Sequence, residues 1–470
     1  MKKFFFFAIL CSIISLTAFS QKIDKDTATV KKEIKKSTKK KDIIKKGWNL
    51  GPLPIVAYDA DRGFEVGALL NLYDFGDGST YPNTRQQWYF EASYYTKGSQ
   101  MYKIFYDNKF SIPNVRFLAS ACYFHDTALD FYGFNGYMSY YDHERVKAGK
   151  DGKDFLYTPY YRIKRSVPMA KIDFIGNIWD NKFYWEAGYH FSWIGLNTIN
   201  RKSINKGKEE SEIFPDEQLT LYEKYQQWGI IPEKEAKGGF NSAIRLGLMY
   251  DTRDKEAAPS KGIWTEAHAI LAPKFLGTTN PFYRYSVTFR HYVPIVKNDV
   301  LTFAYRLNYQ GTFGKEAPFY VLPYMTVLGR EIDYEGFGGY KTVRGLLRNK
   351  VQGLDVATYN VELRWRFIKF VLWKQNIALA LNAFSDGTMA TKNYDMTFKG
   401  EEQYRSDYDK YMALNDNYTS KKGNDLPHIT AGGGFRFIMN QNFIVCVEYG
   451  VPFKKQDGNG SLYINIGYLF

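Results

Sequence analysis

Three shortages in this 470-residue sequence exclude common classes of protein. After Leu16, no stretch approaches the roughly 18 consecutive apolar residues that a membrane-spanning helix needs, so a helical membrane protein is excluded. Cysteine is scarce, and Cys122 and Cys446 lie in segments far apart, so no disulfide framework is expected. The motifs G-x-S-x-G and H-E-x-x-H are missing, and the six histidines lack metal-ligand spacing. We therefore expect no enzyme, no catalytic or metal site and no cofactor.

The N-terminus has the order of a secretory signal peptide. Two lysines at positions 2 and 3 precede an apolar run over residues 4–16, and small residues follow at Ala18 and Ser20. Export signals combine a basic start, an apolar middle and a small-residue cleavage site. The chain is therefore predicted to be cleaved after Ser20, which removes residues 1–20.

Positive charge is concentrated directly after this signal. The formal net charge is +14, and nine lysines lie between Lys31 and Lys46. The segment has too few apolar residues to form a core, so 21–50 is predicted to be a solvated, lysine-rich tail in the periplasm. A contact with anionic lipid headgroups or with an acidic partner is the alternative. Because the positive charge is concentrated in this tail, no nucleic-acid partner is expected.

Aromatic side chains are unusually abundant and suit a membrane β-barrel. They make up 18% of the chain, with 39 Tyr and 36 Phe. A barrel in a membrane needs an outward apolar band bordered by aromatic girdles, around a polar interior. From Asn360 to Phe367 polar and apolar residues alternate, which places every charge of that segment on one face of a strand. One such strand does not distinguish a barrel from a soluble sandwich.

The repetition of strands and turns favours the barrel. Long polar connections at 125–156, 197–239, 312–358 and 385–427 each follow an odd-numbered strand, so all four lie on one side, the external side if the N-terminus is periplasmic. Residues 51–470 are thus predicted to form an all-β domain, a transmembrane antiparallel β-barrel of about sixteen strands. The predicted strands are 53–58, 64–73, 86–96, 101–109, 114–124, 157–173, 182–196, 240–250, 262–272, 282–293, 300–311, 359–368, 375–384, 428–438, 443–451 and 461–470.

Two motifs resemble a known family. Gly338-Gly339-Tyr340-Lys341-Thr342-Val343-Arg344-Gly345-Leu346 is similar to the conserved loop of the BamA/TamA outer-membrane insertase superfamily, also called the bacterial surface antigen family. Phe384-Ser385-Asp386-Gly387 resembles the Phe-x-Asp-x-Gly strand motif of that family, with the glycine one residue early. In the family the loop folds into the barrel and carries Val-Arg-Gly followed by an aromatic residue. Here Leu346 takes the aromatic position.

Other features narrow the resemblance to one branch. The family's insertases usually carry periplasmic domains that receive the client, whereas this sequence has only the lysine-rich tail before Gly51, so it resembles a barrel-only branch. Asp26-Thr27-Ala28 is similar to the O-glycosylation acceptor of Bacteroidetes.

The resemblance implies a lock between loop and barrel. Asp386 shares the parity of Asn382 and Phe384, so its carboxylate is expected to project into the lumen. Only an inward-folded loop can bring the Arg344 guanidinium to it, and Glu362 on the neighbouring strand is the expected second acceptor. Without the resemblance, Arg344 at a solvated loop tip would be the preferred interpretation.

The family resemblance also implies a weak seam between first and last strands, through which the barrel opens sideways. Here the seam would join Leu53–Tyr58 to Tyr463–Phe470. Pro54 removes one ladder donor there, although it could simply start the strand. The residues assigned to the seam are Pro54, Ile55, Tyr58, Tyr463, Tyr468 and Phe470.

These features predict a barrel of the outer membrane that takes part in the assembly, insertion or translocation of outer-membrane proteins or lipids, as an accessory subunit. The expected partners are outer-membrane lipid, outer-membrane protein clients and subunits of an assembly machine. The alternative is a passive channel, a surface receptor or a structural barrel.

Overall fold

The computed structural model describes residues 43–59, 63–141, 146, 157–210, 213–296, 299–326, 336–416 and 423–470. The predicted signal peptide, and the predicted tail as far as residue 42, lie outside the described residues. The described residues form sixteen strands: β1 (Trp48–Asp59), β2 (Gly63–Asp74), β3 (Gln86–Tyr95), β4 (Gln100–Ile112), β5 (Val115–Asp130), β6 (Arg162–Trp179), β7 (Phe183–Asn197), β8 (Gly238–Asp251), β9 (Gly262–Ala272), β10 (Phe282–Val296), β11 (Leu301–Thr312), β12 (Asp355–Leu372), β13 (Gln375–Lys392), β14 (His428–Met439), β15 (Phe443–Pro452) and β16 (Ser461–Ile466).

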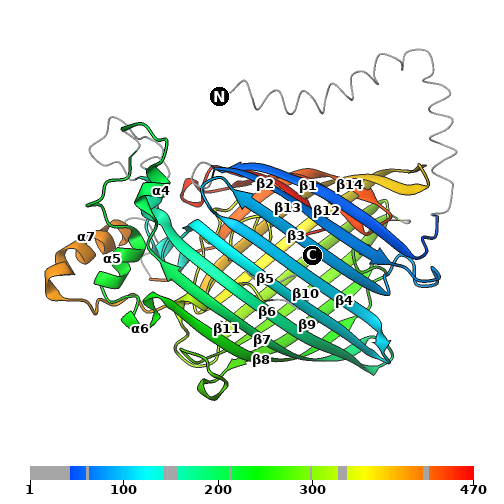
Figure 1. Cartoon of the computed structure of the whole chain (residues 1–470), viewed down its shortest axis with the longest axis horizontal. Coiled ribbons are helices and arrows are strands. Elements are labelled where there is room, and N and C mark those ends of the chain that lie inside the picture. The colour runs from blue at the N-terminus through cyan, green and yellow to red at the C-terminus, as the bar shows by residue number, and fades with distance from the viewer. Residues whose placement is uncertain are drawn as a thin grey trace, which may run out of the picture.

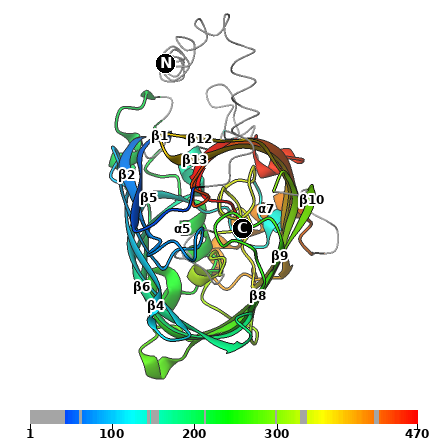
Figure 2. The same cartoon turned by 90° about the vertical axis from the view of Figure 1, so that its right-hand side faces the viewer.

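The sixteen strands form one antiparallel sheet in sequence order, which confirms the predicted number and fold class. The strands lie oblique to the long axis of the molecule (Figure 1). Seen from the end, they surround a central space that contains loops and the C-terminus (Figure 2). No helix among the described residues is long and apolar enough to cross a membrane.

The two faces of β12 show which side of the sheet points into the barrel and which side points out. Glu362 and Arg364 are buried on the inner face, whereas Leu363 and Trp365 are 43% and 49% exposed on the outer face. A soluble sandwich would bury its apolar face and expose its charges. The inverted pattern is that of a barrel whose outer wall faces lipid.

The long connections that follow odd-numbered strands gather at one end of the barrel, here called the cap (Figure 1). The cap contains the helices α4 (Arg201–Asn205), α5 (Leu221–Gln227), α6 (Glu233–Ala236) and α7 (Arg405–Asp416). Aromatic rings from different connections pack together there: the centroid of Phe134 lies 5.6 Å from that of Tyr225, and the centroid of Trp228 lies 5.1 Å from that of Tyr411. The cap is therefore a small apolar core of its own, because buried aromatic rings stabilise it as they do a globular domain.

Both ends of the predicted barrel differ from the structure. β1 begins at Trp48, inside the range 21–50 assigned to the tail, and Ile43 already exchanges two 2.8 Å hydrogen bonds with the side chain of Asn376. β16 ends at Ile466 rather than at residue 470, because Gly467, with φ +83°, turns the chain away from the wall. Tertiary contacts, rather than the alternation of residues, decide both boundaries.

A backbone ladder between the first and last strands stays a prediction. Within the described residues, β1 is hydrogen-bonded along its length to β2, and β16 to β15, and no backbone ladder joins β1 to β16. Side chains meet there instead: a Cβ atom at Gly51 of β1 would lie 2.6 Å from the ring of Phe443 on β15. The last residues after Gly467 leave the wall, so no strand partner remains for the start of β1.

Candidate functional site: a charged cluster inside the barrel

The described parts of the connection between β11 and β12, residues 313–326 and 336–354, include a segment around Arg344 that lies inside the barrel. Gly338 and Gly339 adopt positive φ angles of +119° and +90°, a backbone conformation that favours glycine. Gly339 and Val343 form an isolated antiparallel bridge that closes a tight turn. Val343 and Leu346 are fully buried in a small apolar cluster with Phe337. Leu346, which replaces the aromatic residue of the family motif, thus packs inside the loop.

Arg344 is fully buried, and its guanidinium meets Asp386 of β13. Nε lies 2.8 Å from Oδ2 and Nη2 lies 3.0 Å from Oδ1, while the backbone N–H of Arg344 also donates to Oδ2 at 3.0 Å. Two parallel bonds of this kind fix both distance and orientation. Burial alone would lower the pKa of Arg344, but the charges of Asp386 and Glu362 outweigh it and raise that pKa well above its usual value.

The remaining nitrogen of Arg344 joins two further carboxylates. Nη1 donates to Glu362 Oε1 of β12 and, at 2.8 Å, to Glu448 Oε1 of β15. Arg364 Nε donates to Glu362 Oε2 at 2.6 Å, and Arg436 Nη2 donates to Glu448 Oε1 at 2.8 Å. Three guanidinium groups thus face three carboxylates, and each carboxylate accepts from at least one guanidinium. Buried charges are tolerated in this form because each has partners of opposite sign.

Close backbone approach holds the loop against β15. Gly345 has φ +88°, and a Cβ atom there would lie 2.6 Å from the carbonyl carbon of Gly450. The backbone N–H of Gly345 donates to the hydroxyl of Tyr463 on β16 at 2.9 Å. On the other side of the loop, the ring of Phe384 lies 3.7 Å from the guanidinium carbon of Arg344. The loop therefore touches β13, β15 and β16 within three residues.

The structure separates the residues assigned to the seam. Tyr463 lies in β16 and contacts the loop, whereas Pro54 and Ile55 lie in β1, and Tyr58 pairs with Phe64 of β2 through the backbone. The assignment of Tyr468 and Phe470 to a seam strand is wrong. Both follow the turn at Gly467.

These two C-terminal residues lie inside the barrel. The ring of Tyr468 stacks 4.2 Å from the guanidinium of Arg364, and Arg364 Nη2 donates to the Phe470 carbonyl oxygen at 3.0 Å. Aromatic faces attract a guanidinium. Arg364 therefore connects the C-terminal residues with Glu362, and through it with Arg344.

Sequence reasoning missed three members of the cluster, Arg364, Arg436 and Glu448. All three belong to the inward parity of their strands, and Arg436 and Glu448 are each a single charged residue in an otherwise mostly apolar stretch. A lone charge at an inward position was the available signal, but it did not indicate which partner the charge would meet. Among the described residues, no group of three or more His, Cys, Asp or Glu side chains could hold a metal ion.

The antiparallel sixteen-stranded sheet, turned apolar side out and holding an arginine-bearing loop inside, defines an outer-membrane type of β-barrel. Residues 86–470 match the Omp85 superfamily domain, and the chain belongs to this superfamily. Omp85 proteins are generally insertases or translocators, and membership implies the outer membrane as the location of this chain.

Solved structures resemble the chain at low identity. CdiB from Escherichia coli matches with a TM-score of 0.52 and 10% identity, over 90% of this chain and 63% of that chain. BamA from Haemophilus ducreyi lacking POTRA domains 1-3 matches with a TM-score of 0.46 and 15% identity, over 89% of this chain and 71% of that chain. At these identities the likeness to CdiB bears on the fold alone, and this chain spans less than two thirds of it. No curated protein sequence matches.

Proposed function

We propose that the chain takes part in assembling outer-membrane proteins or lipids, by insertion or translocation, as an accessory subunit of a larger machine. The observation that carries the proposal is the pair of sheet edges at β1 and β16. Each pairs along its backbone with one neighbour only, within the described residues. A strand edge with free backbone groups can accept a client strand by β-augmentation.

Side-chain contacts hold the seam between these two edges. Contacts of this kind would allow the two strands to separate. Pro52 and Pro54 remove two donors from β1, which weakens backbone pairing on that strand. Leu53 of β1 and Ile466 of β16 both pack against the apolar cluster that contains Phe443. Apolar contacts of this kind are non-directional, so they can be exchanged for contacts with a client without stranding a buried polar group.

The cluster around Arg344 would act as the lock that keeps the loop in place. It reaches β12 through Glu362, β13 through Asp386 and β15 through Glu448, while Tyr463 adds a contact to β16. The loop thus ties the last strands together from inside. Its role would be to hold the barrel in one shape while the seam exchanges partners.

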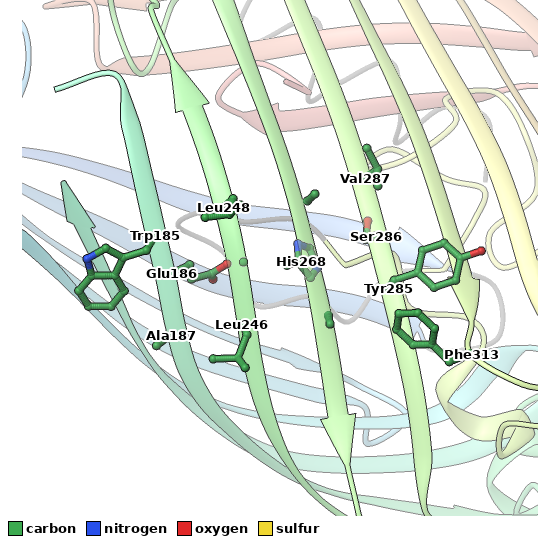
Figure 3. Close-up of a pocket in the computed structure, with 13 residues that line it drawn as sticks. Trp185, Glu186, Ala187, Leu246, Leu248, His268, Tyr285, Ser286, Val287 and Phe313 are labelled. Carbon is green, nitrogen blue, oxygen red and sulfur yellow. The ribbon is translucent and has the colours of Figure 1, made fainter. Parts of the chain in front are cut away.

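Outer-membrane lipid is the partner proposed for the outer wall. β9 presents Ala267 and Ala269 outward, whereas the facing positions of β8 and β10 carry larger side chains. The result is a groove of about 620 Å³ with an apolar lining, bordered by Trp185 and Leu248 on one side and by Tyr285 on the other (Figure 3). Hydrocarbon chains are the apolar medium that such a wall meets in a bilayer.

The predicted division of the chain belongs to the same proposal. Residues 1–20 would direct export, and the lysine-rich tail would lie in the periplasm beside the short turns. Lys45 supports this placement, because its Nζ donates to the Gln375 side chain at 2.8 Å, next to the turn between β12 and β13. The cap would then face the outside.

A photo-crosslinking amino acid placed at the seam tests the function. Val56 of β1 and Ile464 of β16 are 75% and 65% exposed, and Leu246 of β8 serves as a control on the far wall. In growing cells, the two seam positions should capture outer-membrane barrel proteins, or lipids in transit, well above the control. Equal capture at all three positions, or none together with ion conductance in planar bilayers, would favour a passive channel, receptor or structural barrel.

A further inference from the structure

Three connections at the cap end of the barrel meet at one buried histidine. His428 begins β14, Asp425 lies three residues before it, and Asp457 lies in the turn 453–460 between β15 and β16. His428 Nδ1 is 2.6 Å from Asp457 Oδ1, and His428 Nε2 is 3.2 Å from Asp425 Oδ1. All three side chains are fully buried.

The third connection, between β5 and β6, supplies Tyr137. Its ring stacks on His428 at 3.8 Å, its backbone N–H donates to Asp425 Oδ1 at 2.9 Å, and its hydroxyl donates to Asp457. A Cβ atom at Gly136 would lie 2.3 Å from Asp425 Oδ2, so only glycine allows this approach. The four residues therefore form one closed hydrogen-bonded unit.

The geometry defines the charge of the histidine. A carboxylate can only accept, so both imidazole nitrogens must donate, and the ring must carry a proton on each. A neutral ring would turn a lone pair toward one carboxylate. The titratable and charged groups that face the unit are Asp425, Asp457, Tyr137, Lys350 and Lys454.

Lys350 completes the charge balance. Its ammonium is buried 5.5 Å from the ring of Tyr132 and 5.3 Å from that of Tyr141. Burial lowers the pKa of Lys350 to about 8, although Asp457 and Asp425 act against the fall. With His428 and Lys350 protonated, two cations offset two carboxylates. Loss of either proton leaves the buried unit with net negative charge.

We propose that Asp425, His428 and Asp457 form a proton-dependent latch that holds the β15–β16 turn to the cap. The turn leads directly into β16, so the latch would restrain the cap end of that edge strand. Protonated histidine stabilises the closed state, which is therefore complete at low pH and is lost as the pH rises through the pKa of the folded protein. This latch does not depend on the proposed function, because it concerns the position of a turn and not a client.

Spin-label mobility on the full-length protein in lipid tests the latch. Lys455→Cys places a label on the exposed surface of the turn, and Asn181→Cys places a control label on the turn between β6 and β7, at the opposite end of the barrel. Between pH 5 and 9, the ratio of mobile to immobile label at position 455 should rise by up to about tenfold per pH unit above the pKa of the histidine. The control should not change.

Variants separate a proton effect from a general loosening. His428→Gln cannot be protonated, so its label at position 455 should be mobile at every pH. Tyr137→Phe keeps the stacked ring but loses the hydroxyl. In this variant the label at position 455 should be more mobile, and its mobility should still depend on pH. If His428→Gln does not fold, two measurements still test the latch: the pH dependence of the label in the otherwise unchanged protein, and the label mobility in Tyr137→Phe. A pH-independent label in the unsubstituted background, or an unaltered pH response in His428→Gln, overturns the proposal.

Discussion

Replacing Arg344 with alanine would remove one of the three guanidinium groups that face the three buried carboxylates. Asp386 would lose both guanidinium donors, while Glu362 and Glu448 would keep Arg364 and Arg436. Removing one partner of a buried ion pair costs about 3 to 5 kcal/mol, much of it the penalty of a stranded charge. The inward-folded loop should therefore open far more often.

Asp386→Ala should cost less than Arg344→Ala, because Glu362 and Glu448 remain to accept from the guanidinium. In the double variant no stranded Asp386 carboxylate remains. Its cost should thus be no greater than that of Arg344→Ala alone and well below the sum of the two single changes.

Hydrogen exchange of residues 336–351 in the folded barrel measures these costs, since local opening is what exposes the backbone amides. A loss of 3 to 5 kcal/mol corresponds to exchange faster by roughly a hundredfold to several thousandfold. Lys399→Ala is the control, because Lys399 and Asp395 form an ion pair with both side chains 58% exposed, worth under about 1 kcal/mol. Additive costs, or an Arg344→Ala effect no larger than this control, would show that no buried lock exists.

Three further predictions concern the loop and the tail. Gly345→Ala should loosen the loop by more than Gly314→Ala, because both glycines have φ near +87° but only a Cβ at Gly345 meets another backbone; equal losses in thermal unfolding would contradict this. Leu346→Ala should cost about 2 to 5 kcal/mol through the cavity it leaves, and no change in exchange of the loop would disprove that packing. Deleting residues 21–42 should leave a heat-modifiable barrel on gels, whereas failure to fold would make the tail structural.

The alternation of residues was sufficient to predict the sheet. The inward parity of Asp386 follows from a period of two, which is a local property of extended backbone, and the sixteen strands with long connections at one end follow from the repetition of strands and turns. The sequence alone therefore placed Arg344, Asp386 and Glu362 in one neighbourhood, once the loop motif indicated that the connection folds inward.

Only the tertiary structure shows which charged side chains contact one another and where the last strand of the barrel wall ends. Arg436 and Glu448 carry inward charge on strands far from Arg344 in sequence, and their contact depends on how the sheet curves around the loop. Gly467 turns the chain at the end of β16, and Phe470 then meets Arg364, which no local pattern connects with the C-terminus. A period of two assigns a side chain to a face, but its partner across the lumen is set by closure and by the loops that fill the space.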